Sequence, residues 1–294
     1  MNQKEYSFTL NINGRLMELN TPKVMGILNV TPDSFFSSSR YMSEEGILRR
    51  TETMIDEGVD IIDVGACSTR PGIDLVSESE EFLRIRMALH LIRKRWPDFP
   101  ISVDTFRSRI ADMAVSDFEA NIINDISGGE MDPAMFSTMA KLKVPYILMH
   151  MQGTPADMQK SPHYDNMMKE IFLYFSEKIR QLREVGVNDI ILDPGYGFGK
   201  TLDNNYELLR RLPDFQIFEL PLLVGVSRKS MIFKLLNTTP EQALNGTTIL
   251  NTLALNGGAN ILRVHDVKEA RECVQLMQIY KTAGICQSCQ TSLM

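Results

Sequence analysis

The sequence predicts a single (β/α)8 barrel (TIM barrel), the α/β fold in which eight parallel strands alternate with helices. Three observations predict it. Eight short apolar runs recur along the chain, segments with helical spacing separate them, and a hydrogen-bonding side chain ends every run. A chain of 294 residues is about twice the usual domain length, yet single barrels reach this size. Because no linker or low-complexity segment divides the chain, we expect one domain spanning 1–294.

The first segment, "YSFTLNINGRLMEL", predicts a short β-hairpin within residues 1–20 and outside the main fold. Apolar and polar residues alternate there around Asn13 and Gly14, the strongest short-range hairpin signal. The eight apolar runs then follow in the order KVMGILNV, VDIIDVGA, PISVD, ANIINDIS, PYILMH, DIILDPG, PLLVGVS and NILRVHD. Each is apolar almost throughout, as expected for strands that are covered on both faces.

Charged outer faces mark the helical segments between the runs, such as SEEGILRRTETMIDEG and SESEEFLRIRMALHLIRKRW. A doubly wound sheet is the structural alternative. Such sheets seldom contain eight strands in so even a rhythm, and no GxGxxG motif follows the first run. Residues 281–294 are expected to form a tail outside the barrel.

Composition and charge exclude several functional classes. The chain is 44% hydrophobic and 23% charged, which is typical of a globular protein with a sizeable core. A net charge of −6 argues against nucleic acid or an anionic membrane as a partner, because both require a basic surface. We expect a cytoplasmic protein: no apolar run approaches the roughly 20 residues of a membrane span, no secretory signal pattern opens the chain, and the cysteines are too few for a disulfide framework. The tail motif CQSC is expected to be solvent-exposed.

Hydrogen-bonding side chains end all eight predicted strands: Asn29, Asp63, Asp104, Asn124, His150, Asp193, Ser227 and His265. In a barrel, the carboxyl ends of the strands form the active-site face. A single Asp or Asn in such a position is most often a helix cap or a turn residue. Eight together favour a polar site at one mouth of the barrel.

The first and eighth strands become neighbours when the barrel closes. Asn29 is therefore expected beside Arg263 and His265, which share one face of the last strand. Arg and His are donors to anions, and the amide oxygen of Asn29 suits a hard cation such as Mg²⁺, so a polyphosphate would satisfy all three. The alternative for Arg263 is a salt bridge with a neighbouring Asp inside the barrel.

Across the mouth, Asp104, Asn124 and Asp193 end strands three, four and six. Carboxylates and amides on these strand ends suit a flat heterocycle with adjacent N–H donors, such as the amino-pyrimidinone of guanine or a pterin. Lys229 lies where a helix is expected to begin and could reach a ring oxygen or a phosphate. The sequence thus predicts a ring held between acidic and basic walls.

Eight motifs now carry a family resemblance: GILNVTPDSF, STRPG, SVDT, IND, MHMQGTP, DPGYGFGK, GVSRKS and RVHD. In this order, from about residue 24 to 270, they closely resemble the segments of dihydropteroate synthase, a folate-pathway enzyme. The resemblance implies a barrel enzyme that joins 6-hydroxymethyl-7,8-dihydropterin diphosphate to p-aminobenzoate and releases pyrophosphate with the help of Mg²⁺. It also implies a homodimer and a target of sulfonamides. The clearest departure is Ala66-Cys67, where the family commonly has Gly-Glu; Tyr196 and Val226 are milder variants.

The resemblance implies a role for each matching residue. Asp104, Asn124, Asp193 and Lys229 would bind the pterin, while Arg263 and His265 would hold the diphosphate, with Asn29 near the metal. Two loops would close over the site and bring further residues: Asp33, Ser34 and Phe35 from the first, and Thr69 and Arg70 from the second. The p-aminobenzoate pocket would be lined by Pro71, Phe198, Lys229 and Ser230. The catalytic residues implied are Asp33, Asp104, Lys229, Arg263 and His265.

The chemistry favours a dissociative path. Loss of diphosphate leaves a carbocation that the electron-rich dihydropterin ring delocalises, so the enzyme must stabilise a leaving anion and a developing cation. Arg263, His265 and Mg²⁺ would serve the first, and Asp104 and Asp33 the second. Two other functions remain open: a methyltetrahydrofolate-binding barrel of the corrinoid methyltransferase type, and a pterin-binding barrel without catalysis.

Overall fold

A computed structural model describes residues 7–30, 44–66, 76–154, 158 and 162–283. Several residues with predicted roles lie outside this part of the chain: Asp33, Ser34, Phe35, Cys67, Thr69, Arg70 and Pro71. The same holds for Cys286 and Cys289 of the CQSC motif. The structure therefore tests the strand ends and their neighbours, and the roles implied for the two loops stay predictions.

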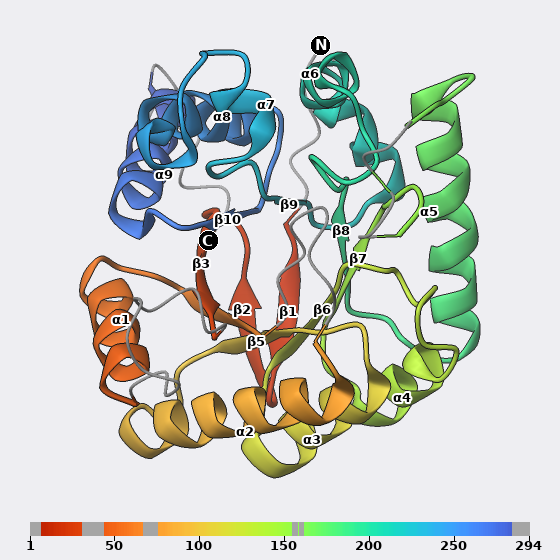
Figure 1. The fold of residues 1–294 in the computed structure, drawn as a ribbon. Helices are drawn as coiled ribbons and strands as arrows, with labels where there is room; N and C mark the ends of the chain where they lie inside the picture. The colour runs from red at the N-terminus through yellow and green to blue at the C-terminus, as the bar shows by residue number, and fades with distance from the viewer. Residues whose placement is uncertain (1–6, 31–43, 67–75, 155–157, 159–161, 284–294) are drawn as a thin grey trace, which may run out of the picture.

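The described residues form the predicted barrel of eight parallel strands (Figure 1). The strands are β3 (Lys23–Asn29), β4 (Ile61–Gly65), β5 (Ile101–Asp104), β6 (Ile122–Asp125), β7 (Tyr146–Met149), β8 (Ile190–Asp193), β9 (Leu223–Val224) and β10 (Ile261–Val264). Each lies within one of the eight apolar runs. They pair in the order β8-β7-β6-β5-β4-β3-β10-β9, and a bridge between Leu192 and Leu222 joins the two edges. The even rhythm of apolar runs predicted this topology correctly.

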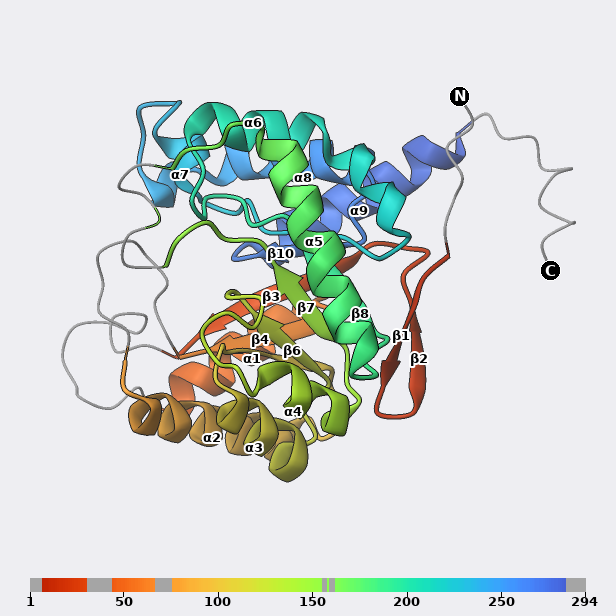
Figure 2. The ribbon, with the colours of Figure 1, turned by 90° about the vertical axis from the view of Figure 1, so that its right-hand side faces the viewer.

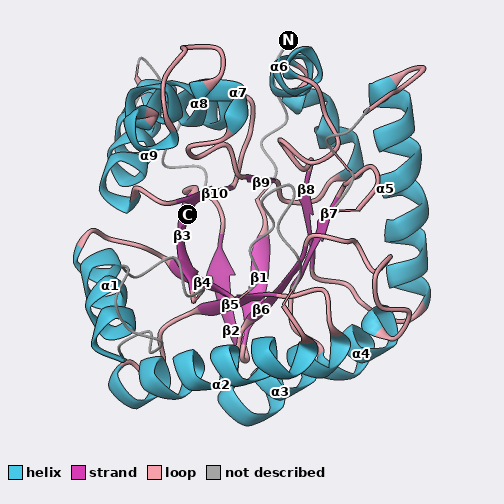
Figure 3. Cartoon of the chain, in the orientation of Figure 1, coloured by secondary structure: helices cyan, strands magenta, loops and turns pink. Residues whose placement is uncertain are grey.

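Helices surround the strands, as Figure 3 shows. They are α1 (Glu44–Asp56), α2 (Glu78–Arg95), α3 (Ser108–Phe118), α4 (Met135–Leu142), α5 (Met167–Glu184), α6 (Leu202–Arg210), α7 (Ser230–Phe233), α8 (Leu244–Asn256) and α9 (Val267–Thr282), with 3₁₀ turns at Leu212–Phe218 and Pro240–Gln242. Local capping fixes several helix starts. Ser77 accepts a hydrogen bond from the backbone of Glu80, and Thr201 and Asn204 form a reciprocal capping box.

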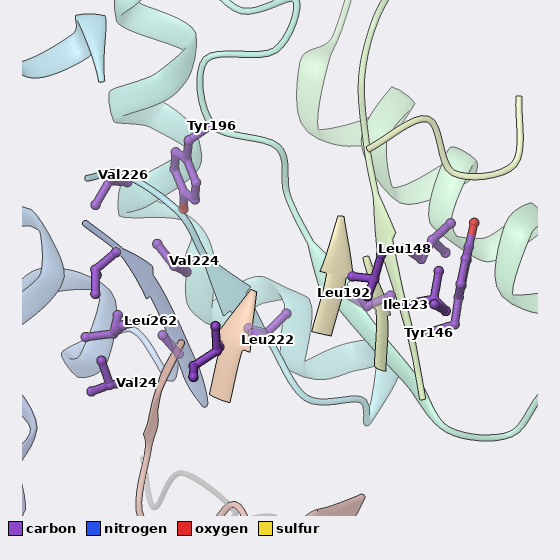
Figure 4. Close-up of a cluster of buried hydrophobic side chains, with 14 of the residues drawn as sticks. Val24, Ile123, Tyr146, Leu148, Leu192, Tyr196, Leu222, Val224, Val226 and Leu262 are labelled. Atoms are coloured by element: carbon purple, nitrogen blue, oxygen red, sulfur yellow. The ribbon is translucent and has the colours of Figure 1, made fainter. Parts of the chain in front are cut away.

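The main core lies between the strands and the helices. Along β3, for example, Val24 and Leu28 face outward and are almost fully buried, because side chains alternate between the two faces of a strand. Figure 4 shows part of this core, including Tyr196, Val224 and Val226. Tyr196 and Val226, the two milder departures from the family pattern, are fully buried there.

The N-terminal hairpin closes the amino end of the barrel. Its strands, β1 (Thr9–Ile12) and β2 (Arg15–Glu18), form a separate antiparallel sheet, as predicted, and lie at one end of the barrel in Figure 2. Leu10 and Ile12 pack against the first inward residues of the strands: Met25, Ile61, Ile122, Ile147, Ile191, Leu223 and Ile261. The expectation that the hairpin lies outside the main fold was wrong for the core, because its apolar face seals the barrel interior.

No helix in the described ranges is both long enough and apolar enough to cross a bilayer.

Candidate active site

A polar layer follows the apolar one inside the barrel. One step farther along the strands, the inward positions are occupied by Asp63, Asp104, Asn124, Asp193 and Arg263. The alternation that buries isoleucine at the amino end thus presents charged and amide groups towards the carboxyl end. The predicted convergence of strand-end side chains is observed for Asp63, Asp104, Asn124 and Asp193.

Arg263 connects three of these strands. Its Nε lies 2.7 Å from Oδ2 of Asp63, and its Nη2 lies 2.6 Å from Oδ2 of Asp104. Asn124 also donates to Oδ2 of Asp63 at 3.2 Å. The salt bridge weighed as the alternative for Arg263 is therefore present, and it involves two carboxylates. Among the described residues, no hydrogen bond is found to Nη1 of Arg263 or to Oδ1 of Asp63. Oδ1 is fully buried, whereas the Arg263 side chain is 19% exposed, so Arg263 is the group that a ligand could reach.

The register corrects the predicted position of Asn29. Strands β3 and β10 are neighbours, as predicted, but Arg263 is level with Met25, four residues before Asn29. The stagger of a closed barrel causes this offset. On its other side, Asn29 is level with Gly65, and Gly65 is level with Asp104. Asn29 thus belongs to the level of Asp104, which Arg263 reaches only through its long side chain.

Lys229 and Phe198 lie together beside the polar layer. Lys229 directly precedes α7, as predicted, and donates from Nζ to the carbonyl oxygen of Tyr196 at 2.5 Å. The same Nζ lies 4.7 Å from the centre of the Phe198 ring, a cation–π contact. Ser230 is the first residue of α7 and is half-buried. These predicted pocket residues lie together.

Burial shifts the pKa of the ionisable groups in this layer. Desolvation raises the pKa of Asp104 to about 7, against the opposing effect of Arg263, and it raises the pKa of Asp193. Desolvation also lowers the pKa of Lys229 to about 8, against the attraction of Asp193. Three carboxylates, Asp63, Asp104 and Asp193, face two cations, Arg263 and Lys229. The layer therefore favours a ligand that brings N–H donors or positive charge.

His265 lies just after β10 and is held by Ser227. Its Nδ1 is 3.1 Å from Oγ of Ser227, which also accepts the backbone N–H of His265 at 3.1 Å. Desolvation, followed by the charge of Arg263, lowers the pKa of His265 to about 4. At neutral pH the ring is therefore uncharged and can donate one hydrogen bond from Nε2 when Nδ1 accepts from Ser227.

Two features were not predicted from the sequence. Phe106, Ile126 and Met149 form a small apolar cluster, against which Phe198 packs. Lys200 is buried in the loop after β8. The first was missed because the search followed polar strand ends, although a flat ring also needs apolar walls. Lys200 could have been noticed in the motif DPGYGFGK, because three glycines at alternate positions precede it and indicate a tightly turned loop.

The fit of Mg²⁺ rests on Asn29. No cluster of three or more His, Cys, Asp or Glu side chains in the described ranges could hold a metal ion. Mg²⁺ does not require such a cluster, since it commonly binds one or two protein oxygens together with water and substrate phosphates. Asn29 ends β3 on the inward side, with an amide oxygen that suits this mode. The residues present thus fit a metal ion that arrives with a phosphorylated substrate.

Comparison with known proteins agrees with this site. The family model described as "Pterin binding enzyme" matches residues 25–265, which span every barrel strand apart from the first two residues of β3. Dihydropteroate synthase of Escherichia coli K12 is 43% identical over 267 residues, covering 90% of this chain and 94% of the relative. The chain belongs to the dihydropteroate synthase family of pterin-binding enzymes. It is accordingly an enzyme, a transferase.

Solved structures of family members share the fold. A sulfonamide complex of Yersinia pestis dihydropteroate synthase has a TM-score of 0.88 at 41% identity, covering 94% of this chain and all of that one. Xanthomonas albilineans dihydropteroate synthase with 4-aminobenzoic acid has a TM-score of 0.86 at 35% identity, covering 94% and 99%. The family assignment favours the synthase over the corrinoid methyltransferase alternative.

Proposed function

We propose that the enzyme condenses 6-hydroxymethyl-7,8-dihydropterin diphosphate with p-aminobenzoate to 7,8-dihydropteroate in folate biosynthesis. One observation carries the proposal: a layer of buried carboxylates and an amide, crossed by Arg263, faces Lys229 and Phe198 at the carboxyl end of the barrel. This combination of groups suits a pterin ring, a diphosphate and an aromatic amine.

Asp104, Asn124, Asp193 and Lys229 bind the pterin. The carboxylate oxygens of Asp104 and Asp193 accept the N–H donors of the amino-pyrimidinone edge, and Asn124 can both donate and accept. Lys229 donates to the ring oxygen after turning from the carbonyl of Tyr196. Because the three strand residues belong to the sheet, they are preorganised, and little ordering entropy is lost on binding.

Arg263 and His265 hold the diphosphate. Arg263 presents Nη1 while its other donors stay on Asp63 and Asp104, and neutral His265 donates from Nε2. Mg²⁺, coordinated in part by Asn29, would neutralise charge on the leaving diphosphate. As the bond to the pterin methylene breaks, positive charge develops near Asp104, whose carboxylate stabilises it. The order of events is dissociative. The bond between the methylene carbon and the diphosphate oxygen breaks first, the amine nitrogen then bonds to the methylene carbon, and the resulting ammonium loses one proton to the released pyrophosphate or to water.

p-Aminobenzoate binds near Phe198, Lys229 and Ser230. The ring packs on Phe198, while Lys229 supplies positive charge and Ser230 a hydroxyl donor for the carboxylate. The amine has a low pKa and needs only correct placement. The complex of the Xanthomonas relative with 4-aminobenzoic acid supports this ligand class. Sulfonamides, which share the aniline ring, are proposed to compete for the same position.

We propose a homodimer formed through α8 and α9. Large apolar side chains are exposed on these helices, including Leu253, Leu276, Ile279 and Tyr280, the last three at 69–73%. Large apolar side chains exposed on two helices in contact with each other are typical of an interface. A twofold dimer would bury the same surface of both subunits.

Product formation tests the proposed activity. The purified protein with Mg²⁺ is incubated with both substrates and with each alone, and pyrophosphate and dihydropteroate are measured. We expect both products only when both substrates are present. Pterin binding without product at any Mg²⁺ concentration would instead indicate a pterin-binding barrel without catalysis. Methyl transfer from methyltetrahydrofolate to a corrinoid would establish the methyltransferase alternative.

A further inference from the structure

Lys200 is buried in a cage of carbonyl oxygens and a histidine ring. Its side chain is 2% exposed. Nζ lies 2.9 Å from the carbonyl oxygen of Gly195, 3.1 Å from that of Phe198 and 3.0 Å from Nδ1 of His150, with the carbonyl oxygen of His150 at 3.4 Å. The side-chain nitrogen thus meets three close acceptors from two different segments, and it carries three N–H donors when it is protonated.

The loop after β8 is shaped to make this cage. Gly195, Gly197 and Gly199 all have positive φ, so the backbone turns at every second residue. A Cβ at Gly195 would overlap the carbonyl oxygen of His150, and a Cβ at Gly199 would overlap the backbone of Gln152. The loop therefore packs with its backbone directly on the segment after β7. Lys200 then ties the two segments together from inside.

The electrostatics of the cage suit a hydrogen-bonding role. Desolvation lowers the pKa of Lys200 to about 7, and desolvation followed by the charge of Lys200 holds the pKa of His150 well below its usual range. His150 is therefore neutral and its Nδ1 can accept. Asp193 attracts Lys200 and Lys229 repels it, but the groups within hydrogen-bonding distance are neutral acceptors. Lys200 is thus available to hold backbone carbonyls rather than to form an ion pair.

The caged loop carries the proposed p-aminobenzoate wall. Phe198 lies between Gly197 and Gly199, and its carbonyl oxygen accepts from Lys200 while its ring faces Lys229. The carbonyl oxygen of Tyr196, in the same loop, accepts from Lys229. One loop thus lies between two lysines, a buried one that anchors it and a half-buried one that faces the site.

We propose that Lys200 is a positioning residue that fixes Phe198 for p-aminobenzoate. The proposal rests on the proposed function for its ligand, but the anchoring itself does not. Loss of Lys200 releases the loop from the end of β7, and the aromatic wall moves. The pterin contacts on β5, β6 and β8 are held by the sheet and remain in place.

Lys200→Met tests the proposal, since it keeps the apolar stem and removes the three donors. Lys178→Met is the matched control, because Lys178 is also largely buried but pairs with Glu130 on the outside of the barrel. Hydrogen exchange of the peptide covering 194–200 should become at least about tenfold faster in Lys200→Met and stay unchanged in the control. The KM for p-aminobenzoate should rise about tenfold, while the Kd of the pterin changes less than about threefold.

His150→Phe removes the ring acceptor but keeps an aromatic ring beside Tyr174, and it gives a second variant if Lys200→Met does not fold. It should show the same pattern with smaller changes. Unchanged exchange in 194–200 would overturn the proposal, as would equal losses for both ligands. If the wild-type protein makes no dihydropteroate, the proposed function fails, yet the exchange experiment still decides whether Lys200 anchors the loop.

Discussion

Arg263 has two tasks at the centre of the polar layer. It pairs with both Asp63 and Asp104, which would otherwise be buried without a counter-ion, and under the proposed function its remaining nitrogen, Nη1, holds the diphosphate. The two carboxylates in turn fix the guanidinium plane, so the arginine is preorganised for a phosphate. Structural and binding roles, which the sequence presented as alternatives, would be combined in one side chain under the proposed function.

Arg263→Lys separates these roles. Lysine retains the charge but cannot contact both carboxylates and a phosphate in one plane. We expect the Kd of the pterin diphosphate, measured by calorimetry, to rise about a hundredfold, against less than threefold for the free hydroxymethyl pterin. Arg271→Lys, at the Arg–Asp60 pair near the amino end of the strands, is the control and should leave both unchanged. Equal weakening of the two ligands would make Arg263 purely structural.

Lys200 predicts a pH dependence of stability. Its pKa is about 7 in the folded protein and ordinarily 10.5. Between pH 7 and pH 10.5 the unfolded chain binds one proton more than the folded protein does. The free energy of unfolding therefore rises with pH in this range, and this contribution is lost as the pH falls through 7. We expect urea unfolding at pH 7.5 and 9.5 to show this effect. The free energy of unfolding of the wild type, relative to that of Lys200→Met, should increase by up to about 1.4 kcal/mol per pH unit. A difference that does not change with pH would contradict the lowered pKa.

At the scale of elements, the loop after β8 depends on backbone contact. Gly195 and Gly186 both have positive φ, but only at Gly195 would a Cβ meet neighbouring atoms. Gly186→Ala is therefore expected to lower the free energy of unfolding by about 1 kcal/mol, the cost of left-handed backbone alone. Gly195→Ala should cost at least about 2 kcal/mol more and should also raise the KM for p-aminobenzoate. Equal costs in urea unfolding would show that the close approach is unimportant.

The hairpin contributes to stability without approaching the site. Leu10 is 1% exposed in the amino-end core, whereas Leu16 is 73% exposed on the same hairpin. We expect Leu10→Ala to lower the free energy of unfolding by about 2–4 kcal/mol and Leu16→Ala by less than about 0.5 kcal/mol. Neither should change KM, because the polar layer lies towards the other end of the barrel. A KM change in Leu10→Ala would show coupling between the two ends.

The strands were predictable, but the way they are staggered was not. An apolar run with a polar end predicts each strand locally. Closure of the barrel follows from the number and order of the strands. Whether Arg263 is level with Met25 or with Asn29 depends on the stagger of the closed sheet, which no local pattern records. The packing of the hairpin into one apolar cluster with residues from seven strands is equally non-local. Lys200 was missed because its partners are mostly backbone carbonyls, which side-chain patterns do not reveal.

At the scale of the whole molecule, the exposed apolar surface of α8 and α9 predicts dimerisation. Leu276→Asp places a charge at the centre of this surface and should shift the protein to monomer at micromolar concentration in sedimentation velocity. Leu173→Asp on α5, where the leucine is 60% exposed, is the control and should remain dimeric. A monomeric wild type would contradict the proposed dimer. A Leu276→Asp protein that stays dimeric would show that the interface lies elsewhere.

The central claim is that the polar layer inside the barrel is the active site of the synthase. Pyrophosphate release with both substrates and Mg²⁺ tests it most directly in Asp104→Asn, compared with Asp98→Asn at an exposed surface loop. Asparagine keeps the shape of Asp104 but removes the charge opposite Arg263 and the developing cation. We predict that kcat/KM falls by about a hundredfold or more in Asp104→Asn and is unchanged in Asp98→Asn. Wild-type turnover in a folded Asp104→Asn protein would contradict the claim.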